Sequence, residues 1–316
     1  MAKSSELILN KDGSLYHLAL RKGEVAEKII TVGDPDRVSE VSRHFDRIEV
    51  ERKAREFVSC TGTLNGERLS VISTGIGTDN VDIVMNELHS LFHIDLRTGE
   101  PLDTTTKLTF LRLGTSGTIR ENIPVDSILA SEAALGFDGL LHFYQYDIGE
   151  EEVRKLMETK PALKDLPRPY LAFGDADMLE HFKACYNHQG VTVTAPGFYA
   201  PQGRQVNIPP RLINFTGILG ESEVAGIPVT NIEMETAGIY GLASVLGHRA
   251  LSVSAILANR ISGEFSSTPI KTVERCQAKL ENDYADAEYP KAAKLLDVVR
   301  CSVSFNTLEQ LLAGYD

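Results

Sequence analysis

Short apolar runs rich in β-branched residues alternate along the sequence with segments of helical periodicity. The runs predict strands, and the periodic segments between them predict helices. We expect strands at residues 28–32, 69–73, 108–113, 127–131, 191–195, 229–232 and 250–258, and helices at residues 37–43, 80–92, 176–187, 235–246 and 272–299. Strands that alternate with helices are typical of an α/β fold, in which helices cover a sheet.

No linker or change in composition divides the 316 residues, so we expect one domain over residues 1–316. Residues 96–107 contain a glycine, a proline and three consecutive threonines, a pattern that predicts an exposed loop. No apolar run approaches the roughly 20 residues of a membrane span, and residues 1–7 lack the pattern of a signal peptide. We therefore expect a cytoplasmic protein.

Charge and cysteine content disfavour several classes of function. The net charge of -12 opposes nonspecific binding to nucleic acid, which requires a basic surface. The cysteines are scattered, with no C-x-x-C pair, at Cys60, Cys185, Cys276 and Cys301. This spacing argues against a zinc site and against a disulfide framework. An anionic ligand would have to be held by a few arginines placed locally.

Two glycine turns follow apolar strands and carry arginines. Residues 31–38 bring a turn and a helix N-terminus next to Arg37, an arrangement suited to an anion. A simple turn is the alternative. Residues 111–118 place Arg112 between leucines, where a buried guanidinium needs a partner. That partner is either a bound anion or a buried carboxylate.

Two acidic residues, Glu233 and Glu235, lie on alternate positions where a strand passes into a helix. We expect their side chains to diverge, unlike the carboxylate pair of a glycosidase. One of them could accept hydroxyl protons from a sugar diol, and helix capping is the alternative. Residues 198–204 combine an aromatic ring, an amide and a guanidinium, which can bind a flat heterocycle but are also common in surface loops.

Histidines and one further glycine pair give weaker signals. His89 and His93 stand four apart, but H-E-x-x-H is absent, so we interpret them as packing or surface residues and expect no metal. Gly75 and Gly77 lack the third glycine of a dinucleotide motif. His17 has no local partner, and its surroundings alone favour a structural role.

From Tyr16 to about Arg260, the order of these segments resembles the nucleoside phosphorylase family of the α/β type, and its uridine-cleaving branch in particular. The resemblance implies a single-domain, three-layer α/β/α sandwich with a central mixed, partly barrel-like sheet. It also implies pyrimidine salvage: phosphate attacks C1' of uridine with inversion, giving uracil and ribose 1-phosphate. Catalysis would rest on positioning and electrostatics.

The resemblance assigns a role to each motif. Phosphate would be held by Gly33, Arg37, Arg55, Arg112 and Thr115, ribose by His17, Glu233, Met234 and Glu235, and the base by Gly117, Phe198, Gln202, Arg204 and Arg260. The catalytic residues among them would be Arg112, Thr115, Arg204 and Glu235. His17 and Arg55 would reach the site of a neighbouring subunit. The resemblance therefore implies at least a homodimer, with a hexamer also open.

The residue at position 259, an asparagine, helps to distinguish a pyrimidine substrate from a purine substrate. Purine enzymes of the family place an aspartate at this position to protonate the leaving base, whereas an amide cannot act as a general acid. Uracil can leave as an anion, which Arg204 and Gln202 would stabilise. A purine nucleoside phosphorylase or nucleosidase remains an alternative, because residues 234–238 are also close to the purine enzymes. A noncatalytic nucleoside-binding protein is another.

The resemblance implies no cofactor. Inorganic phosphate is a substrate. Related enzymes can hold a monovalent cation at the dimer interface through the equivalents of Glu56 and Ile76, but Asn80 stands where they have serine. The base loop, residues 200–204, also departs from the usual Pro-Gly-Gln-Glu-Arg. Two further differences are the insertion at residues 96–107 and the extended region at residues 147–169. These departures could alter how the base enters the site or how subunits assemble.

Overall fold

The computed structural model describes residues 5–267 and arranges them around one 11-stranded sheet. Its strands are hydrogen-bonded in the order β11-β12-β10-β8-β13-β7-β1-β4-β3-β2, with β9 on β8. Their bounds are β1 Lys28–Val32, β2 Arg47–Ala54, β3 Phe57–Leu64, β4 Glu67–Ser73, β7 Thr109–Thr118, β8 Ile128–Gly136, β9 Tyr170–Phe173, β10 His188–Thr194, β11 Glu223–Val224, β12 Ile227–Glu233 and β13 Arg249–Asn259. Two short strands, β5 Ile94–Asp95 and β6 Glu100–Pro101, form a separate antiparallel pair.

Part of this sheet closes into a ring. Strand β7 pairs in parallel with β1 and β13, and its last residues also pair with β12, where Gly117 and Thr118 lie opposite Ile232 and Asn231. Strands β7, β13, β8, β10 and β12 thus form a closed hoop. This arrangement confirms the expected mixed, partly barrel-like sheet. It also brings the second glycine turn beside the strand that carries Glu233.

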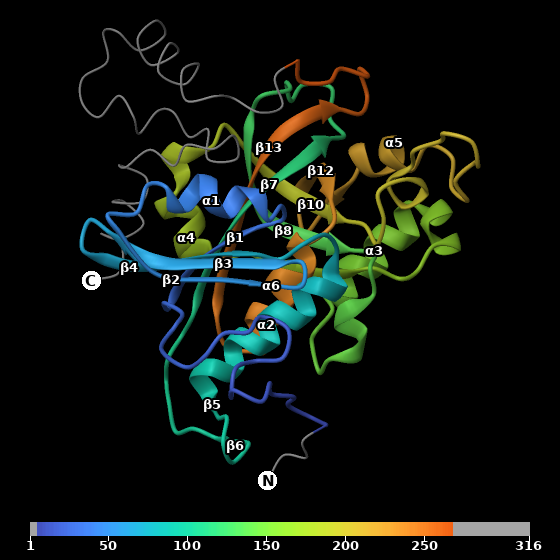
Figure 1. Ribbon diagram of the computed structural model, residues 1–316. Coiled ribbons are helices and arrows are strands. Elements are labelled where there is room, and N and C mark those ends of the chain that lie inside the picture. Colours follow the sequence, from blue (N-terminus) through green and yellow to red (C-terminus); the bar gives the residue numbers. More distant parts are fainter. Residues whose placement is uncertain (1–4, 268–316) are drawn as a thin grey trace, which may run out of the picture.

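Helices cover both faces of the sheet, as Figure 1 shows. Helices α1 Asp36–Ser42 and α4 Ala176–His181 lie over one face, and α2 Thr78–His93 and α6 Thr236–Val245 lie over the other. Helices α3 Glu150–Thr159 and α5 Phe215–Gly220 pack beside the ring. The three-layer α/β/α prediction is therefore confirmed.

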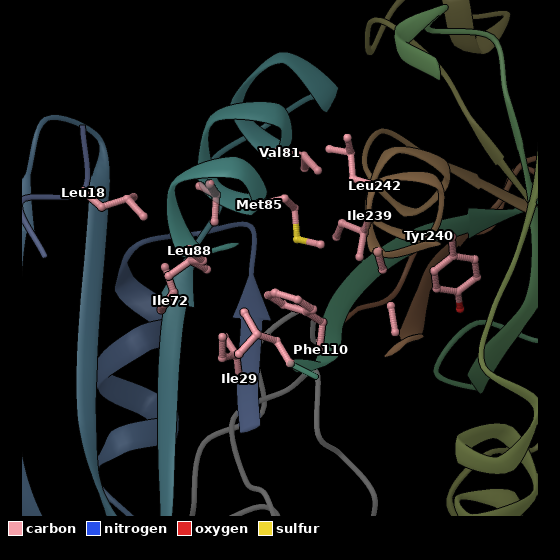
Figure 2. Close-up of a cluster of buried hydrophobic side chains, with 14 of the residues drawn as sticks. Leu18, Ile29, Ile72, Val81, Met85, Leu88, Phe110, Ile239, Tyr240 and Leu242 are labelled. Carbon is pink, nitrogen blue, oxygen red and sulfur yellow. The ribbon is translucent and has the colours of Figure 1, made fainter. Parts of the chain in front are cut away.

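Apolar side chains alternate between these two faces. Ile29 and Phe110 point toward α2 and α6, where they pack with Met85, Leu88 and Ile239 (Figure 2). The following residues on the same strands, Ile30 and Leu111, belong to the cluster under α1 and α4. Central strands buried on both faces have apolar residues at successive positions. This burial explains the uninterrupted runs that made the strands recognisable in the sequence.

Each predicted strand is present, but one predicted helix is wrong in extent. Helix α4 ends at His181, and a short 3-10 helix, Lys183–Cys185, follows it. Residues near 187 instead join the start of the next strand. Asn187 donates its backbone N-H to the carbonyl of Ile128, and its side-chain oxygen accepts the N-H of Ile128. These two hydrogen bonds anchor the chain next to β8 and prevent the helix from continuing.

Several elements lie outside the sequence-based expectations. The β2–β3 hairpin, helix α3 and helix α5 were not predicted, and β6 lies within the expected loop 96–107. The predicted helix 272–299, Cys276 and Cys301 lie outside the described residues. Among residues 5–267, no helix combines the length and apolarity required to cross a membrane.

Candidate active site

A pocket of about 860 Å³ opens where the carboxyl ends of β1, β4, β7 and β12 meet. Ligands of α/β proteins usually bind at such strand ends. Most of the predicted site residues line this pocket, namely Gly33, Arg37, Arg112, Thr115, Gly117, Phe198, Gln202, Arg204, Glu233, Met234 and Glu235. The structure thus brings together segments that are up to two hundred residues apart in the sequence.

At the floor of the pocket, Arg112 forms ion pairs with both acidic residues. Its Nη2 lies 2.9 Å from Glu233 Oε2 and 2.6 Å from Glu235 Oε2, and all three side chains are buried. Its Nη1 lies 3.3 Å from the hydroxyls of Ser252 and Ser254. The expected divergence of Glu233 and Glu235 is therefore wrong. Strand β12 ends at Glu233, so the alternation rule no longer applies at Glu235.

The two carboxylates have different partners. Glu233 accepts hydrogen bonds from the Thr194 hydroxyl at 2.7 Å and from the backbone N-H groups of Glu235 and Thr236. Each of its oxygens is thus engaged within the protein. Glu235 uses one oxygen for Arg112 and accepts the N-H of Gly77 at 2.9 Å with the other. Glu233 holds the turn in place, while Glu235 forms fewer bonds at the pocket surface.

Burial and charge act in opposite directions within this cluster. Burial raises the pKa of Glu235, and the charge of Arg112 offsets only part of that effect. For Arg112, burial lowers the pKa, but the attraction of Glu233 and Glu235 outweighs burial, so its pKa lies above the ordinary value. Arg112 is therefore a permanent positive charge at the floor of the pocket.

Gly114 makes room for this guanidinium. A Cβ atom at Gly114 would lie 1.8 Å from Arg112 Nη1, which is shorter than any non-bonded contact allows. Glycine at this position lets the arginine fold back over its own strand toward the carboxylates. The first glycine of the segment 111–118 is thus explained by close approach to a side chain.

The first glycine turn supplies a second arginine. Gly33 and Arg37 line the pocket, and Arg37 Nη1 lies 3.4 Å from the carbonyl of Leu113. Arg37 therefore contacts the strand that carries Arg112 and Thr115. Helix α1 has only seven residues, and the Asp34 carboxylate accepts the N-H of Asp36 at its start. The guanidinium of Arg37 is thus the stronger anion-binding feature of this turn.

The opposite end of the pocket is formed by the loop at residues 198–204. The guanidinium carbon of Arg204 lies 3.7 Å from the centre of the Phe198 ring, and Arg204 donates to Gln202 Oε1. Burial and then the nearby charge of Arg260 lower the pKa of Arg204 to about 10, so it stays protonated at neutral pH. An aromatic face, an amide and a cation thus lie together at this end of the pocket.

Arg260 lies directly behind this loop. Its Nη2 donates to the carbonyl of Gln202 at 3.3 Å, and its side chain packs against Gly117. Its Nη1 is buried and has no hydrogen-bond partner within the described residues. Arg260 contacts the loop at this end of the pocket without lining the pocket itself.

Asn259 is engaged entirely in loop structure. Its Nδ2 donates to the carbonyls of Arg120, Glu121 and Ile123, at 3.1 to 3.3 Å. Its Oδ1 accepts the N-H groups of Ile261 and Ser262 at 3.0 Å. An amide whose donors and acceptor are occupied in this way supports the loops beneath the pocket and cannot protonate a ligand.

Two further predicted residues, His17 and Arg55, neither line the pocket nor contact the loop at residues 198–204. His17 Nδ1 is 2.6 Å from Glu87 Oε1, and Glu87 also accepts the backbone N-H groups of His17 and Leu18. Arg55 is exposed, and its guanidinium stacks 4.7 Å above the ring of Tyr16. His17 and Arg55 are therefore neighbours on one surface, joined through Tyr16. Within one chain, neither completes the pocket.

Some contributors to the site were not among the residues predicted to bind phosphate, ribose or base. The backbone N-H of Gly77 holds Glu235, and Thr194 holds Glu233, although neither residue belongs to a charged motif. Glu56, Ile76 and Asn80, the residues considered for an interface cation, also line the pocket. Parallel strands bring such residues to one edge, but only the folded backbone shows which groups meet.

The fold and the pocket define an α/β protein with a polar ligand site at the ends of its strands. The model of the phosphorylase superfamily matches residues 27–284. A uridine phosphorylase of Thermococcus kodakarensis is 30% identical over 265 residues, covering 83% of each chain. A DeoD-type purine nucleoside phosphorylase of Oceanobacillus iheyensis is 26% identical, covering 78% of this chain and 88% of its own.

Among solved structures, a nucleoside phosphorylase of Trypanosoma brucei that shows uridine phosphorylase activity matches with a TM-score of 0.74. It is 29% identical, and the match covers 82% of this chain and 92% of that one. The chain belongs to the phosphorylase superfamily.

Proposed function

We propose that this protein is a uridine phosphorylase, which splits uridine with inorganic phosphate into uracil and ribose 1-phosphate. The observation that supports this function is the content of a single pocket. Arg112 and Glu235 lie at its floor, and Gln202 and Arg204 lie at its opposite end. A nucleoside has the matching order of groups, because its ribose connects the position of phosphate attack to a flat, polar base.

Each end of the pocket has one task in the proposed reaction. Phosphate binds between Arg37 and Arg112, with Gly33 and Thr115 beside it. Glu235 and Met234 bind the ribose, and one Glu235 oxygen exchanges its bond to Arg112 for a sugar hydroxyl. Phosphate then attacks C1' of a ribosyl group with positive charge on its ring oxygen, and the bond from C1' to uracil breaks on the opposite side. Fixed positions and fixed charges supply the catalysis.

The leaving base carries the electron pair of the broken bond. Arg204 and Gln202 stabilise the charge that develops on uracil, while Phe198 stacks on its ring and Gly117 and Arg260 close the base end. No proton donor is required because uracil leaves as an anion. The engaged amide of Asn259 fits this route. It also disfavours a purine, whose departure is assisted by protonation.

The reaction is tested by measuring uracil release from uridine and hypoxanthine release from inosine, each with and without phosphate. We expect uracil release that depends on phosphate and exceeds hypoxanthine release at equal substrate concentration. Uracil release without phosphate would show a hydrolase and refute the mechanism. Faster release of hypoxanthine would assign the protein to the purine enzymes, and binding of uridine without any product would show a noncatalytic binding protein.

We further propose that the chain acts as at least a dimer, in which His17 and Arg55 complete the pocket of the partner subunit. The support is their common surface: Arg55 stacks on Tyr16, which lies next to His17. His17 would reach the ribose, and Arg55 would reach the phosphate. A site divided in this way cannot be complete within one chain.

Subunit mixing tests the shared site. His17→Ala and Arg204→Ala are each expected to have low activity, because each lacks one group in every pocket. Equal amounts, unfolded and refolded together, should regain about a quarter of wild-type activity, since half of the dimers carry one intact pocket. No regain in mixed dimers, verified by two distinguishable tags, would refute the sharing of His17.

The proposed chemistry requires neither a metal ion nor an organic cofactor. Arginine side chains carry the positive charge that a metal would otherwise supply at the phosphate. Activity on uridine is therefore expected to persist after treatment with a chelator. A loss of activity that only added metal restores would contradict this part of the proposal.

A further inference from the structure

Three histidines meet at the amino ends of the central strands, at the opposite end of the strands from the pocket. His89 and His93 come from α2, and His248 precedes β13. Nitrogen atoms of the three rings all lie within 4.8 Å of one another, and His89 Nδ1 is 3.0 Å from His248 Nε2. The sequence motif showed only the first two, because His248 lies far along the chain.

The nitrogen atoms are close enough to share an ion once one ring turns. The rings of His89 and His93 are stacked, with their centres 4.1 Å apart and their planes 5° apart. A tetrahedral zinc ion with bonds of about 2.0 Å to nitrogen requires its ligands to lie about 3.3 Å from one another. The separation of His89 Nδ1 and His248 Nε2 is close to that value. An ion lies in the plane of each imidazole that binds it, and parallel rings share no such point, so His93 has to rotate out of its stack on His89 to become the third ligand.

Both ring nitrogens of His93 lie within hydrogen-bond distance of a carbonyl oxygen. Its Nδ1 lies 3.1 Å from the carbonyl of His89, and its Nε2 lies 2.9 Å from the carbonyl of Thr106. A neutral imidazole has one N-H and can donate to only one of these carbonyls. The lone pair of the other nitrogen faces the second carbonyl oxygen and becomes available to a metal when the ring rotates. A ligating histidine that donates its remaining N-H to a carbonyl is the usual arrangement.

One existing bond opposes ligation. The backbone N-H of Leu108 donates to His248 Nδ1 at 3.3 Å, and a ring ligated through Nε2 must carry its proton on Nδ1. That long hydrogen bond has to break. His248 follows Gly247, whose φ of 75° marks the turn between α6 and β13, so the residue belongs to neither element. Three bonds from imidazole to metal outweigh one long hydrogen bond.

We propose that His89, His93 and His248 form a binding site for a divalent transition-metal ion such as zinc, with solvent as the fourth ligand. An all-imidazole set selects zinc, copper or nickel over magnesium or calcium, which prefer oxygen. The site revises the expectation that the chain binds no metal. It does not depend on the proposed function.

The position of the cluster indicates a structural role. Helix α2 runs from the pocket, where Gly77 holds Glu235, to His93 at its other end, near β5 and β6 in Figure 1. An ion bound there would join the end of α2 to the loop before β13. It would stabilise the fold without contacting the reacting groups.

The test uses untagged full-length protein, freed of metal with a chelator and then titrated with zinc alone. Calorimetry should show one ion per chain, and zinc at a hundredfold excess over its Kd should raise Tm by roughly 5 °C. Cobalt substituted for zinc should give the visible absorption of a tetrahedral nitrogen site. Magnesium should change neither measurement.

His89→Gln, His93→Gln and His248→Gln should each weaken zinc binding at least about 100-fold. His181→Gln provides the matched control, since His181 lies outside the cluster, and its binding should stay as in the wild type. The cobalt spectrum of the wild type remains informative if a variant fails to fold. The absence of zinc binding by the wild type, or equal binding by the cluster variants, would overturn the proposal.

Discussion

The two ends of the pocket are built in different ways. At the end proposed for phosphate and ribose, Arg112 lies within β7 and Glu233 and Glu235 lie at the end of β12, and all three are at most 6% exposed. At the base end, Phe198 belongs to a loop and is 51% exposed, and Arg204 is held mainly by its own loop. The end with Arg112 is part of the protein core, whereas the end with Arg204 is a partly exposed loop outside the core.

This difference indicates how reaction and specificity are divided. Groups that stabilise a reacting centre must be held within a fraction of an ångström, which strand ends and buried ion pairs achieve. Groups that recognise a base can occupy a loop, because loops change without disturbing the core. Substitutions at the core end should therefore affect stability and reaction together, whereas those at the loop end should affect only the use of uridine.

Arg112→Met should have the largest effect. It leaves Glu233 and Glu235 buried without their cation, which should cost about 3–5 kcal/mol of stability. Phosphorolysis of uridine should fall at least about 10³-fold. Denaturant unfolding and steady-state kinetics measure the two effects. Arg97→Met, at a side chain that is 87% exposed, is the control and should change neither. An Arg112→Met protein as stable as the wild type would contradict the core assignment.

Arg204→Ala should reduce kcat/KM for uridine by about 10²–10³-fold, because the leaving uracil loses its cation. Phosphate affinity and Tm should change little, since Arg204 lies at the other end of the pocket. Calorimetry with phosphate alone separates the two ends. Arg211→Ala, an exposed residue of the same region, should behave as the wild type. Equal loss of uridine turnover and phosphate binding would show that the base-loop assignment is wrong.

Asn259→Asp tests whether a carboxyl group at this position is sufficient for purine chemistry. Aspartate cannot donate to the carbonyls of Arg120, Glu121 and Ile123, so stability should fall by about 1–3 kcal/mol. Inosine turnover should not rise, because the side chain faces these loops. Asn214→Asp, at an exposed position, should leave Tm nearly unchanged. Inosine turnover approaching that of uridine would refute this account.

Phe198→Leu should have the smallest effect. The substitution removes the contact between the ring and Arg204, worth about 0.5–1 kcal/mol, and should lower kcat/KM for uridine roughly two- to fivefold. Stability should not change. Tyr199→Leu removes an exposed neighbouring ring that does not line the pocket, and should not affect kinetics. A larger loss of kcat/KM from Tyr199→Leu than from Phe198→Leu would show that Tyr199, and not Phe198, contacts the base.

The core end was largely predictable from the sequence. Central strands buried on both faces leave apolar runs, and glycine turns after those runs mark the edge where parallel strands end. The burial of Arg112 also followed from its flanking leucines, and its partner proved to be two carboxylates. The convergence of those carboxylates was not predictable, because it depends on the backbone at Glu235, with φ of -135° and ψ of -33°.

Other features required the folded chain for a different reason. The β2–β3 hairpin lacks an apolar run on its outer strand, whose residues are exposed or half-buried throughout. His248 joins His89 only because β13 and α2 meet in space. The hydrogen bonds of Asn259 involve three carbonyls of a distant loop. Local patterns carry no information on contacts of this range.

The closure of the sheet between β7 and β12 also bears on how copies of this chain can associate. A strand that is paired on both sides cannot recruit another chain, so the ring removes two potential edges. At one end of the strand order lies β2, whose sequence RIEVERKA carries charges of both signs. Charged edges resist pairing with other strands. Assembly is therefore expected to proceed through side-chain surfaces such as that of Tyr16 and Arg55, and growth by sheet extension is disfavoured.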